Sequence, residues 1–205
     1  MLNLHKWFPT VIGATECPFI NEIQKEYKEY LNIREDTPQG YQYLHLHKDE
    51  RFKRLYDWKQ EQVNTFTEAH NYKTMKPCES WYFDYEPHEN NPWHKHLGWA
   101  ISTIFYLQAE PQDQPTRFRS PFYHSSNPLL IRPKMGERAV LNPIELNEAE
   151  RFNELTYLTC KYKPYSGKLL VFNSALEHMS DNKRPDLGPR IIFSTNYNSI
   201  EGGHK

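Results

Sequence analysis

The chain has 205 residues, short enough for one domain, since single domains extend to ~250 residues. Its 25 lysines and arginines against 26 aspartates and glutamates give a formal net charge of −1. That balance excludes any electrostatic argument for binding nucleic acid or an anionic membrane. We expect one domain over residues 1–205, with neither nucleic acid nor a membrane as partner.

The three cysteines, Cys17, Cys78 and Cys160, are odd in number and widely spaced. They therefore indicate neither a disulfide framework nor a CxxC site, and a reducing compartment is the default. No apolar run approaches the ~18 residues that a membrane-spanning helix needs, and residues 1–10 do not resemble a signal peptide. These features predict a cytoplasmic protein.

The first 72 residues carry mainly helical patterns. Residues 7–12 predict a short opening strand with a proline at its edge. A helix is predicted to begin at Pro18, because proline suits the first turn and apolar residues recur at three- and four-residue spacing through residue 31. The turn-forming residues 36–40 end this pattern. A second helix, predicted over residues 49–70, has its apolar residues on one face. Both helices are expected to pack against the outside of a sheet.

Short strands dominate beyond residue 72. Aromatic residues make up 15% of the chain and there are 15 prolines, which favours strands and turns. A helical turn is predicted over residues 147–152. The predicted strands are residues 79–86, 93–97, 100–108, 116–123, 138–142, 156–163, 167–173 and 190–198. Two helices followed by about eight strands predict a mainly β fold, a double-stranded β-helix or cupin-like jelly-roll over residues 73–205, with residues 1–72 as helical support.

A His-x-His pair, His94 and His96, lies in a tract rich in aromatic and β-branched residues. On a strand, alternate side chains face the same way, so such a pair can present two imidazoles to one point. Neutral imidazole is a ligand for Fe, Zn, Cu and Ni, although two exposed histidines would give the same pattern. A second pair, His45 and His47, directly precedes a charged helix start, and we do not interpret it as a metal site.

The second half of a metal site is predicted within residues 167–198. A strongly apolar strand is followed by His178, and a polar hairpin then leads to a last strand that begins with Arg190. This order predicts His178 and Arg190 on neighbouring strands that face one cavity. Arginine offers a rigid fork of donors for a carboxylate and is costly to bury without such a partner. A surface or salt-bridged arginine is the alternative.

These motifs resemble the iron(II)/2-oxoglutarate-dependent oxygenases, and more narrowly a branch of them found in marine bacteria and their phages. The resemblance covers most of the chain and implies the same jelly-roll fold. It also implies the cytoplasm of a bacterium or of a phage-infected host cell. The residues that carry it are 7–11, 46–55, Ser80-Trp81, His94-Lys95-His96, 104–107 and, most specifically, 167–172 with His178, Arg190 and 193–196.

The resemblance implies that His94, His96 and His178 bind Fe(II), with no catalytic residue beyond these ligands. The superfamily at large has a carboxylate where this chain has His96. A site of three histidines lacks one negative charge, which leaves Fe(II) more electrophilic. A replacement carboxylate could come from Asp84, Glu177 or Asp186.

The resemblance also implies a site for the 2-oxoglutarate co-substrate. Arg190 would bind its C5 carboxylate. Tyr106 matches a tyrosine that donates to the same carboxylate in related hydroxylases, and Tyr85 matches a position that often lines the pocket. Both tyrosines could instead be core aromatic residues. The loop over residues 112–119 departs from the relatives' pattern and is expected to shape the substrate mouth.

The function implied is an Fe(II)- and 2-oxoglutarate-dependent dioxygenase that hydroxylates an unactivated C–H bond, consumes O2, and releases succinate and CO2. Two alternatives remain open: a metal-binding jelly-roll module without turnover, and a cupin-like dioxygenase with three histidines that does not use 2-oxoglutarate. The substrate, either a small molecule or a peptidyl side chain, is not fixed by the sequence. The oligomeric state is also open, and a homodimer is compatible with it.

Overall fold

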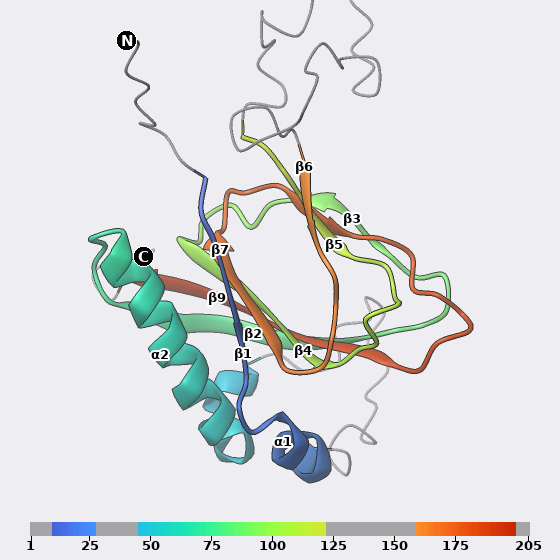
Figure 1. The fold of residues 1–205 in the computed structure, drawn as a ribbon. Coiled ribbons are helices and arrows are strands. Elements are labelled where there is room, and N and C mark those ends of the chain that lie inside the picture. The colour runs from blue at the N-terminus through green and yellow to red at the C-terminus, as the bar shows by residue number, and fades with distance from the viewer. Residues whose placement is uncertain (1–9, 28–44, 122–158, 200–205) are drawn as a thin grey trace, which may run out of the picture.

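Two antiparallel sheets face each other in the computed structural model, which describes residues 10–27, 45–121 and 159–199 (Figure 1). The larger sheet has the order β1 (Ile12–Glu16), β7 (Lys168–Asn173), β4 (Ile101–Gln108), β9 (Arg190–Ser199) and β2 (Met75–Tyr85). The smaller sheet has the order β3 (Asn91–His94), β8 (His178–Ser180), β5 (Thr116–Arg119) and β6 (Thr159–Tyr162). This arrangement confirms the predicted jelly-roll.

The helices lie on the outer face of the larger sheet, as expected (Figure 1). They are α1 (Ile20–Tyr27), the short 3-10 turns η1 (Leu46–Lys48) and η2 (Glu50–Phe52), and α2 (Lys53–Ala69). The side chain of Asp49 accepts a hydrogen bond from the Arg51 backbone N–H at 3.0 Å, which caps the start of η2. No helix in the described part of the chain is long and apolar enough to cross a membrane.

Most predicted strands are present, with shifted ends. A strand lies at Ile12–Glu16, where its backbone pairs with Phe172–Lys168 of β7, while residues 7–9 of the predicted opening strand lie outside the described residues. The strand β8 was not predicted, since three residues are too few for an alternating pattern. The predicted strand over residues 138–142 and the helical turn over residues 147–152 lie outside the described residues.

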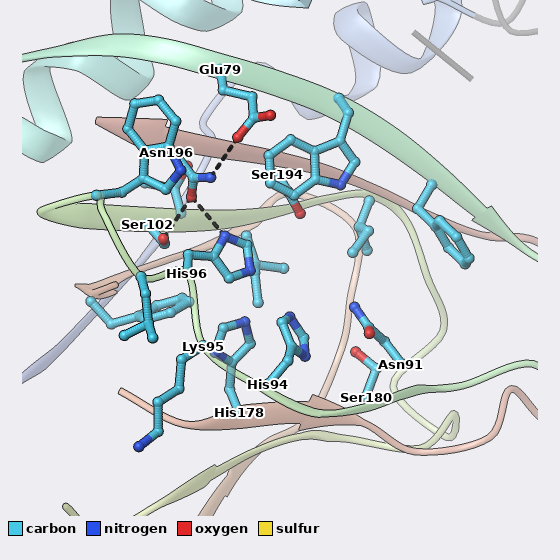
Figure 2. A pocket seen from close by; sticks show the side chains of 18 of the residues that line it. Glu79, Asn91, His94, Lys95, His96, Ser102, His178, Ser180, Ser194 and Asn196 are labelled. Carbon is cyan, nitrogen blue, oxygen red and sulfur yellow. Dashed lines mark hydrogen bonds between the residues drawn. The ribbon is translucent and has the colours of Figure 1, made fainter. Parts of the chain in front are cut away.

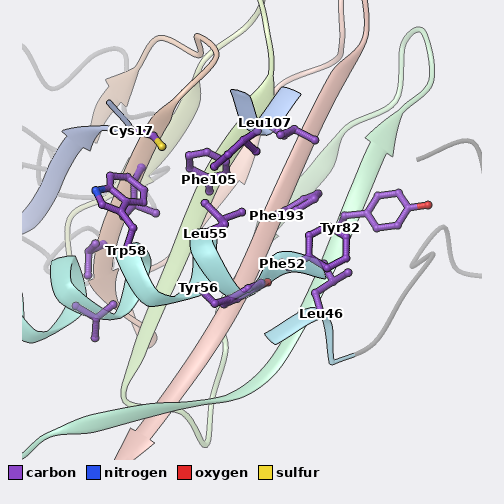
Figure 3. Close-up of a cluster of buried hydrophobic side chains, with 14 of the residues drawn as sticks. Cys17, Leu46, Phe52, Leu55, Tyr56, Trp58, Tyr82, Phe105, Leu107 and Phe193 are labelled. Atoms are coloured by element: carbon purple, nitrogen blue, oxygen red, sulfur yellow. The ribbon is translucent and has the colours of Figure 1, made fainter. Parts of the chain in front are cut away.

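Alternation along the larger sheet divides its side chains into two sets. In β9, Phe193 and Tyr197 point toward the helices, whereas Ile192 packs in a separate cluster inside the jelly-roll. The outer set packs with Leu55 and Trp58 of α2 to form the main core (Figure 3). Burial of each large apolar side chain contributes about 1.5–3 kcal/mol to the stability of the fold. This packing therefore fixes which face of each strand is turned toward the helices and which toward the inside of the jelly-roll.

One lysine is buried in this apolar layer. Lys59 of α2 is fully buried, and its Nζ donates to Thr195 Oγ1 at 2.7 Å and lies 4.7 Å from the ring centroid of Tyr56. Burial lowers the pKa of Lys59 to about 7, because the charged ammonium loses its hydration.

We predict that Lys59→Met stabilises the fold near pH 7 by about 1–4 kcal/mol, since an apolar side chain of similar length has no charge to desolvate. Between about pH 7 and pH 10.5 the unfolded chain binds more protons at Lys59 than the folded protein, so wild-type stability rises with pH in that window. The advantage of Lys59→Met should therefore be largest at or below pH 7 and shrink as the pH rises. Denaturant unfolding at several pH values measures it.

The control is Lys53→Met, since Lys53 lies on the same helix with an exposed side chain. It should change the unfolding free energy little at any of these pH values. A Lys59→Met advantage that stays constant with pH would contradict the assigned cause.

Candidate metal centre

Three histidines converge between the two sheets. His94 ends β3, His96 follows two residues later, just before the turn at Leu97 and Gly98, and His178 begins β8. One ligand nitrogen from each lies within 4.8 Å of the others, and the ring centroids are 4.2–5.2 Å apart. The structure thus brings together the three residues that the sequence singled out.

The expectation that His94 and His96 share one strand is wrong. Strand β3 ends at His94, and the chain turns at Leu97 and Gly98, where Gly98 has a φ of +95°. The backbone N–H of His96 donates to the Ser174 carbonyl at 2.9 Å. His96 therefore lies beyond the end of the strand, where this hydrogen bond to the segment after β7 holds its backbone.

Each of the three rings has its Nδ1 at an oxygen. The partners are the Pro92 carbonyl for His94 at 2.7 Å, the Leu176 carbonyl for His178 at 2.9 Å, and Asn196 Oδ1 for His96 at 2.8 Å. Since these oxygens only accept, each Nδ1 carries the hydrogen, and the lone pair of the neutral ring lies on Nε2. This is the pattern that surrounds histidines that bind a metal through Nε2.

Burial keeps these rings neutral. Desolvation is the largest cause that lowers the pKa of all three, and for His178 the value falls to about 3, with His94 adding to the effect. Metal binding requires deprotonated nitrogen, so the neutral rings suit a cation. The donor set of three imidazoles fits Fe(II), and equally fits other divalent first-row metals.

The three proposed replacement carboxylates lie outside this cluster. Glu177 forms an ion pair with Arg119 at 2.8 Å, and Asp186 forms one with Arg184 at 2.5 Å. Asp84 is also not among the clustered ligands. Among the described residues, the group of converging ligands consists of the three histidines.

The histidines open into a cavity of about 500 Å³ (Figure 2). Its wall includes the inward faces of β2 and β9, and its lining is rich in aromatic side chains. Trp81 stacks on His96 with centroids 5.6 Å apart and an interplanar angle of 20°. Of the described lining residues, Glu79 is the acidic one and Lys95 is the basic one apart from the histidines.

Arg190 is buried, with 2% of its surface exposed, and belongs to the same inward-facing row of β9 as Asn196. The prediction that Arg190 and His178 lie on neighbouring strands is wrong, because β8 belongs to the smaller sheet and β9 to the larger one. Arg190 Nη2 nevertheless donates to the Asp181 carbonyl at 2.8 Å, three residues after His178. Arg190 Nε has no hydrogen-bond partner among the described residues.

The two tyrosines lie near Arg190. The Tyr85 ring lies 4.1 Å from the Arg190 guanidinium and lines the cavity. The hydroxyl of Tyr106 is 2.5 Å from Thr116 Oγ1, and burial raises the pKa of Tyr106, so the hydroxyl keeps its proton. Neither Arg190 nor Tyr106 belongs to the described cavity wall, whereas Ser180, 3.5 Å from Thr116 Oγ1, does.

The loop over residues 112–119, expected at the substrate mouth, lies against Arg190. Asp113 is buried, and its Oδ2 lies 3.5 Å from Arg190 Nη1. Asp113 Oδ1 also accepts from the backbone N–H of Gln114 at 2.8 Å. The loop contacts Arg190 because β5, which includes Thr116, pairs with β8 just beyond the metal cluster.

Sequence reasoning missed Asp113 and the residues that hold His96. Asn196 lies in the motif over residues 193–196, which by itself predicts no role for it. Glu79 alternates with Trp81 and Phe83 on the inward face of β2, a pattern visible in the sequence. Its contact with Asn196 depends on a pairing over 117 positions, for which the sequence gives no local signal.

The fold and the histidine cluster together define a jelly-roll of the metal-dependent oxygenase type. Residues 79–196, more than half of the chain, match the profile of the family described as "Putative 2OG-Fe(II) oxygenase". The chain belongs to this family, whose members use Fe(II), 2-oxoglutarate and O2. No curated protein matches the chain in sequence.

Solved structures share the fold at low identity. AviO1 from Streptomyces viridochromogenes Tue57 has a TM-score of 0.62 and 13% identity, covering 96% of this chain and 93% of that one. HygX from Streptomyces hygroscopicus, solved with nickel and 2-oxoglutarate bound, has a TM-score of 0.61 and 15% identity, covering 94% and 84%. A Pseudomonas putida prolyl-4-hydroxylase has a TM-score of 0.58 and 10% identity, covering 93% of both chains.

We predict that His178→Ala weakens Ni(II) or Co(II) binding by more than about 100-fold. Loss of a group that only hydrogen-bonds to a metal ligand already weakens metal binding about 10–100-fold. Isothermal titration of the purified protein measures it. His45→Ala, from the second His-x-His pair, should keep wild-type affinity. An equal loss in both variants, or none in either, would contradict the assignment.

Proposed function

We propose that this protein hydroxylates an unactivated C–H bond of its substrate, with release of succinate and CO2, and that His94, His96 and His178 bind the iron. The observation that carries this proposal is the orientation of the three imidazoles. Each donates its Nδ1 hydrogen to an oxygen, so that the three Nε2 lone pairs remain for one cation in a cavity.

Arg190 is proposed to bind the far carboxylate of 2-oxoglutarate. Its burial, its unpartnered Nε and its position near Asp181 support this role. Tyr85 would hold the guanidinium from one side, and Tyr106 would supply a hydroxyl through a small displacement from Thr116. Asp113 balances the arginine charge and holds the guanidinium in place.

Bound Fe(II) and 2-oxoglutarate supply the oxidising power from O2, and the chain positions the reactants. The aromatic side chains of the cavity wall would shield one side of the space beside the histidines from water when a substrate is bound. The cavity volume of about 500 Å³ leaves room for a substrate group beside the co-substrate. The substrate could be a small molecule or a side chain of a peptide, and the proposal applies to either.

The decisive experiment is succinate release from 2-oxoglutarate by the Fe(II)-loaded protein without a primary substrate. We expect slow release that His178→Ala abolishes and Arg190→Ala strongly reduces, while Arg54→Ala, an exposed arginine on α2, does not change it. Metal binding without 2-oxoglutarate binding would overturn the proposal in favour of a metal-binding module. Oxygen consumption that needs no 2-oxoglutarate and survives in Arg190→Ala would favour the three-histidine dioxygenase.

We predict separately that Arg190→Ala weakens 2-oxoglutarate binding at least about 30-fold, since truncating one partner of a buried charge pair costs 2–5 kcal/mol. Arg190→Lys should be intermediate, because it keeps the charge but loses the fork of donors. Anaerobic titration, followed through the visible charge-transfer band of the iron–2-oxoglutarate complex, measures both. Equal affinity for 2-oxoglutarate in wild type and Arg190→Ala would show that Arg190 does not bind this co-substrate.

A further inference from the structure

A hydrogen-bonded row crosses three adjacent strands behind His96. Asn196 of β9 pairs in register with Glu79 of β2 on one side and with Ser102 of β4 on the other. Asn196 Nδ2 donates to Glu79 Oε2 at 3.0 Å, and Asn196 Oδ1 accepts from His96 Nδ1 at 2.8 Å and from Ser102 Oγ at 2.7 Å (Figure 2).

His96 differs from the other two histidines in what holds it. His94 and His178 donate to backbone carbonyls close to them in sequence, whereas His96 donates to a side chain 100 positions away. The orientation of that side chain is itself fixed. A carboxylate oxygen accepts only, so Glu79 binds the NH2 group of Asn196 and turns its Oδ1 toward His96.

The same row carries charge. Three neutral imidazoles give a divalent cation no negative ligand, and Glu79 is the acidic residue of the described cavity lining. A carboxylate that accepts from the NH2 group polarises the amide and makes its oxygen a stronger acceptor, since hydrogen bonds in a chain reinforce one another. A stronger acceptor at Nδ1 makes Nε2 of the same ring a better metal ligand.

We infer that Glu79 and Asn196 are positioning residues for the metal: Glu79 acts through the Asn196 amide to orient His96 and to strengthen its Nε2 as a ligand. This inference rests on the proposed function, because it takes His96 as a metal ligand. It places the negative charge of the metal site two hydrogen bonds away from the cation, on Glu79.

The test is Co(II) affinity and the visible ligand-field spectrum of the Co(II)-loaded protein, without 2-oxoglutarate. Asn196→Ala should weaken binding about 10–100-fold, and Glu79→Gln about 3–10-fold with a shifted spectrum. Adding Glu79→Gln to Asn196→Ala should cause no further loss, since the path from Glu79 to His96 is already broken. Equal fractional losses from Glu79→Gln in both backgrounds would overturn the inference.

A rescue variant separates positioning from loss of structure. In Glu79→Gln/Asn196→Asp, a carboxylate accepts directly from His96 Nδ1, and Co(II) affinity should return to at least the wild-type value. Failure of this rescue in a protein that unfolds at the wild-type temperature would overturn the inference. Ser194→Ala, two residues away on the same face of β9, should leave Co(II) affinity unchanged.

The outcomes also separate this inference from the proposed function. Wild-type protein that binds no Co(II), Ni(II) or Fe(II) would overturn both. Tight metal binding that is indifferent to Glu79→Gln and to Asn196→Ala would overturn the inference alone, because the three histidines would then hold the metal without help from the row.

Discussion

The register of β9 is the constraint on which both the core and the candidate site depend. Its odd-numbered residues, such as Phe193 and Tyr197, pack against the helices, and its even-numbered residues, from Arg190 to Asn196, face the interior. Ladders with β4 and β2 hold the strand from both sides. A slip by one residue would turn Phe193 into the cavity and Asn196 into the apolar layer, so hydrophobic packing on one face also fixes the polar geometry on the other.

The same register explains how a polar cluster persists inside a jelly-roll. Buried polar groups are costly unless they are hydrogen-bonded, and here the row of Glu79, Asn196 and Ser102 satisfies its members across three strands. The Nδ1 groups of His94 and His178 are satisfied differently, because they donate to backbone carbonyls that are present whatever the neighbouring side chains are. Of the three histidines, His96 is the one whose Nδ1 hydrogen bond depends on a side chain of the larger sheet.

Much of this could be predicted from the sequence. Apolar periodicity indicated both helices, alternation indicated most strands, and the histidine motifs indicated the three side chains that converge. What could not be predicted depends on contacts between distant residues. Strand β8 is three residues long and exists through pairing with β3 and β5. The contact of Asp113 with Arg190 joins a loop to a strand 77 positions later, and no periodicity reports it.

The second His-x-His pair shows why a motif needs its surroundings. The backbone N–H of His47 donates to Ser80 Oγ at 2.9 Å, His47 Nδ1 lies 2.7 Å from the same oxygen, and the backbone N–H of His45 donates to the Ser80 carbonyl. Ser80 lies between two cavity-lining residues, Glu79 and Trp81, with its own side chain on the helical face of β2. The pair therefore anchors β2 from its outer side. At the same point on the inner side of the strand, Glu79 binds Asn196 and Trp81 stacks on His96. The two similar motifs thus differ in their surroundings: the first lies in the cavity, and the second lies on the opposite face of β2, where it is hydrogen-bonded to Ser80.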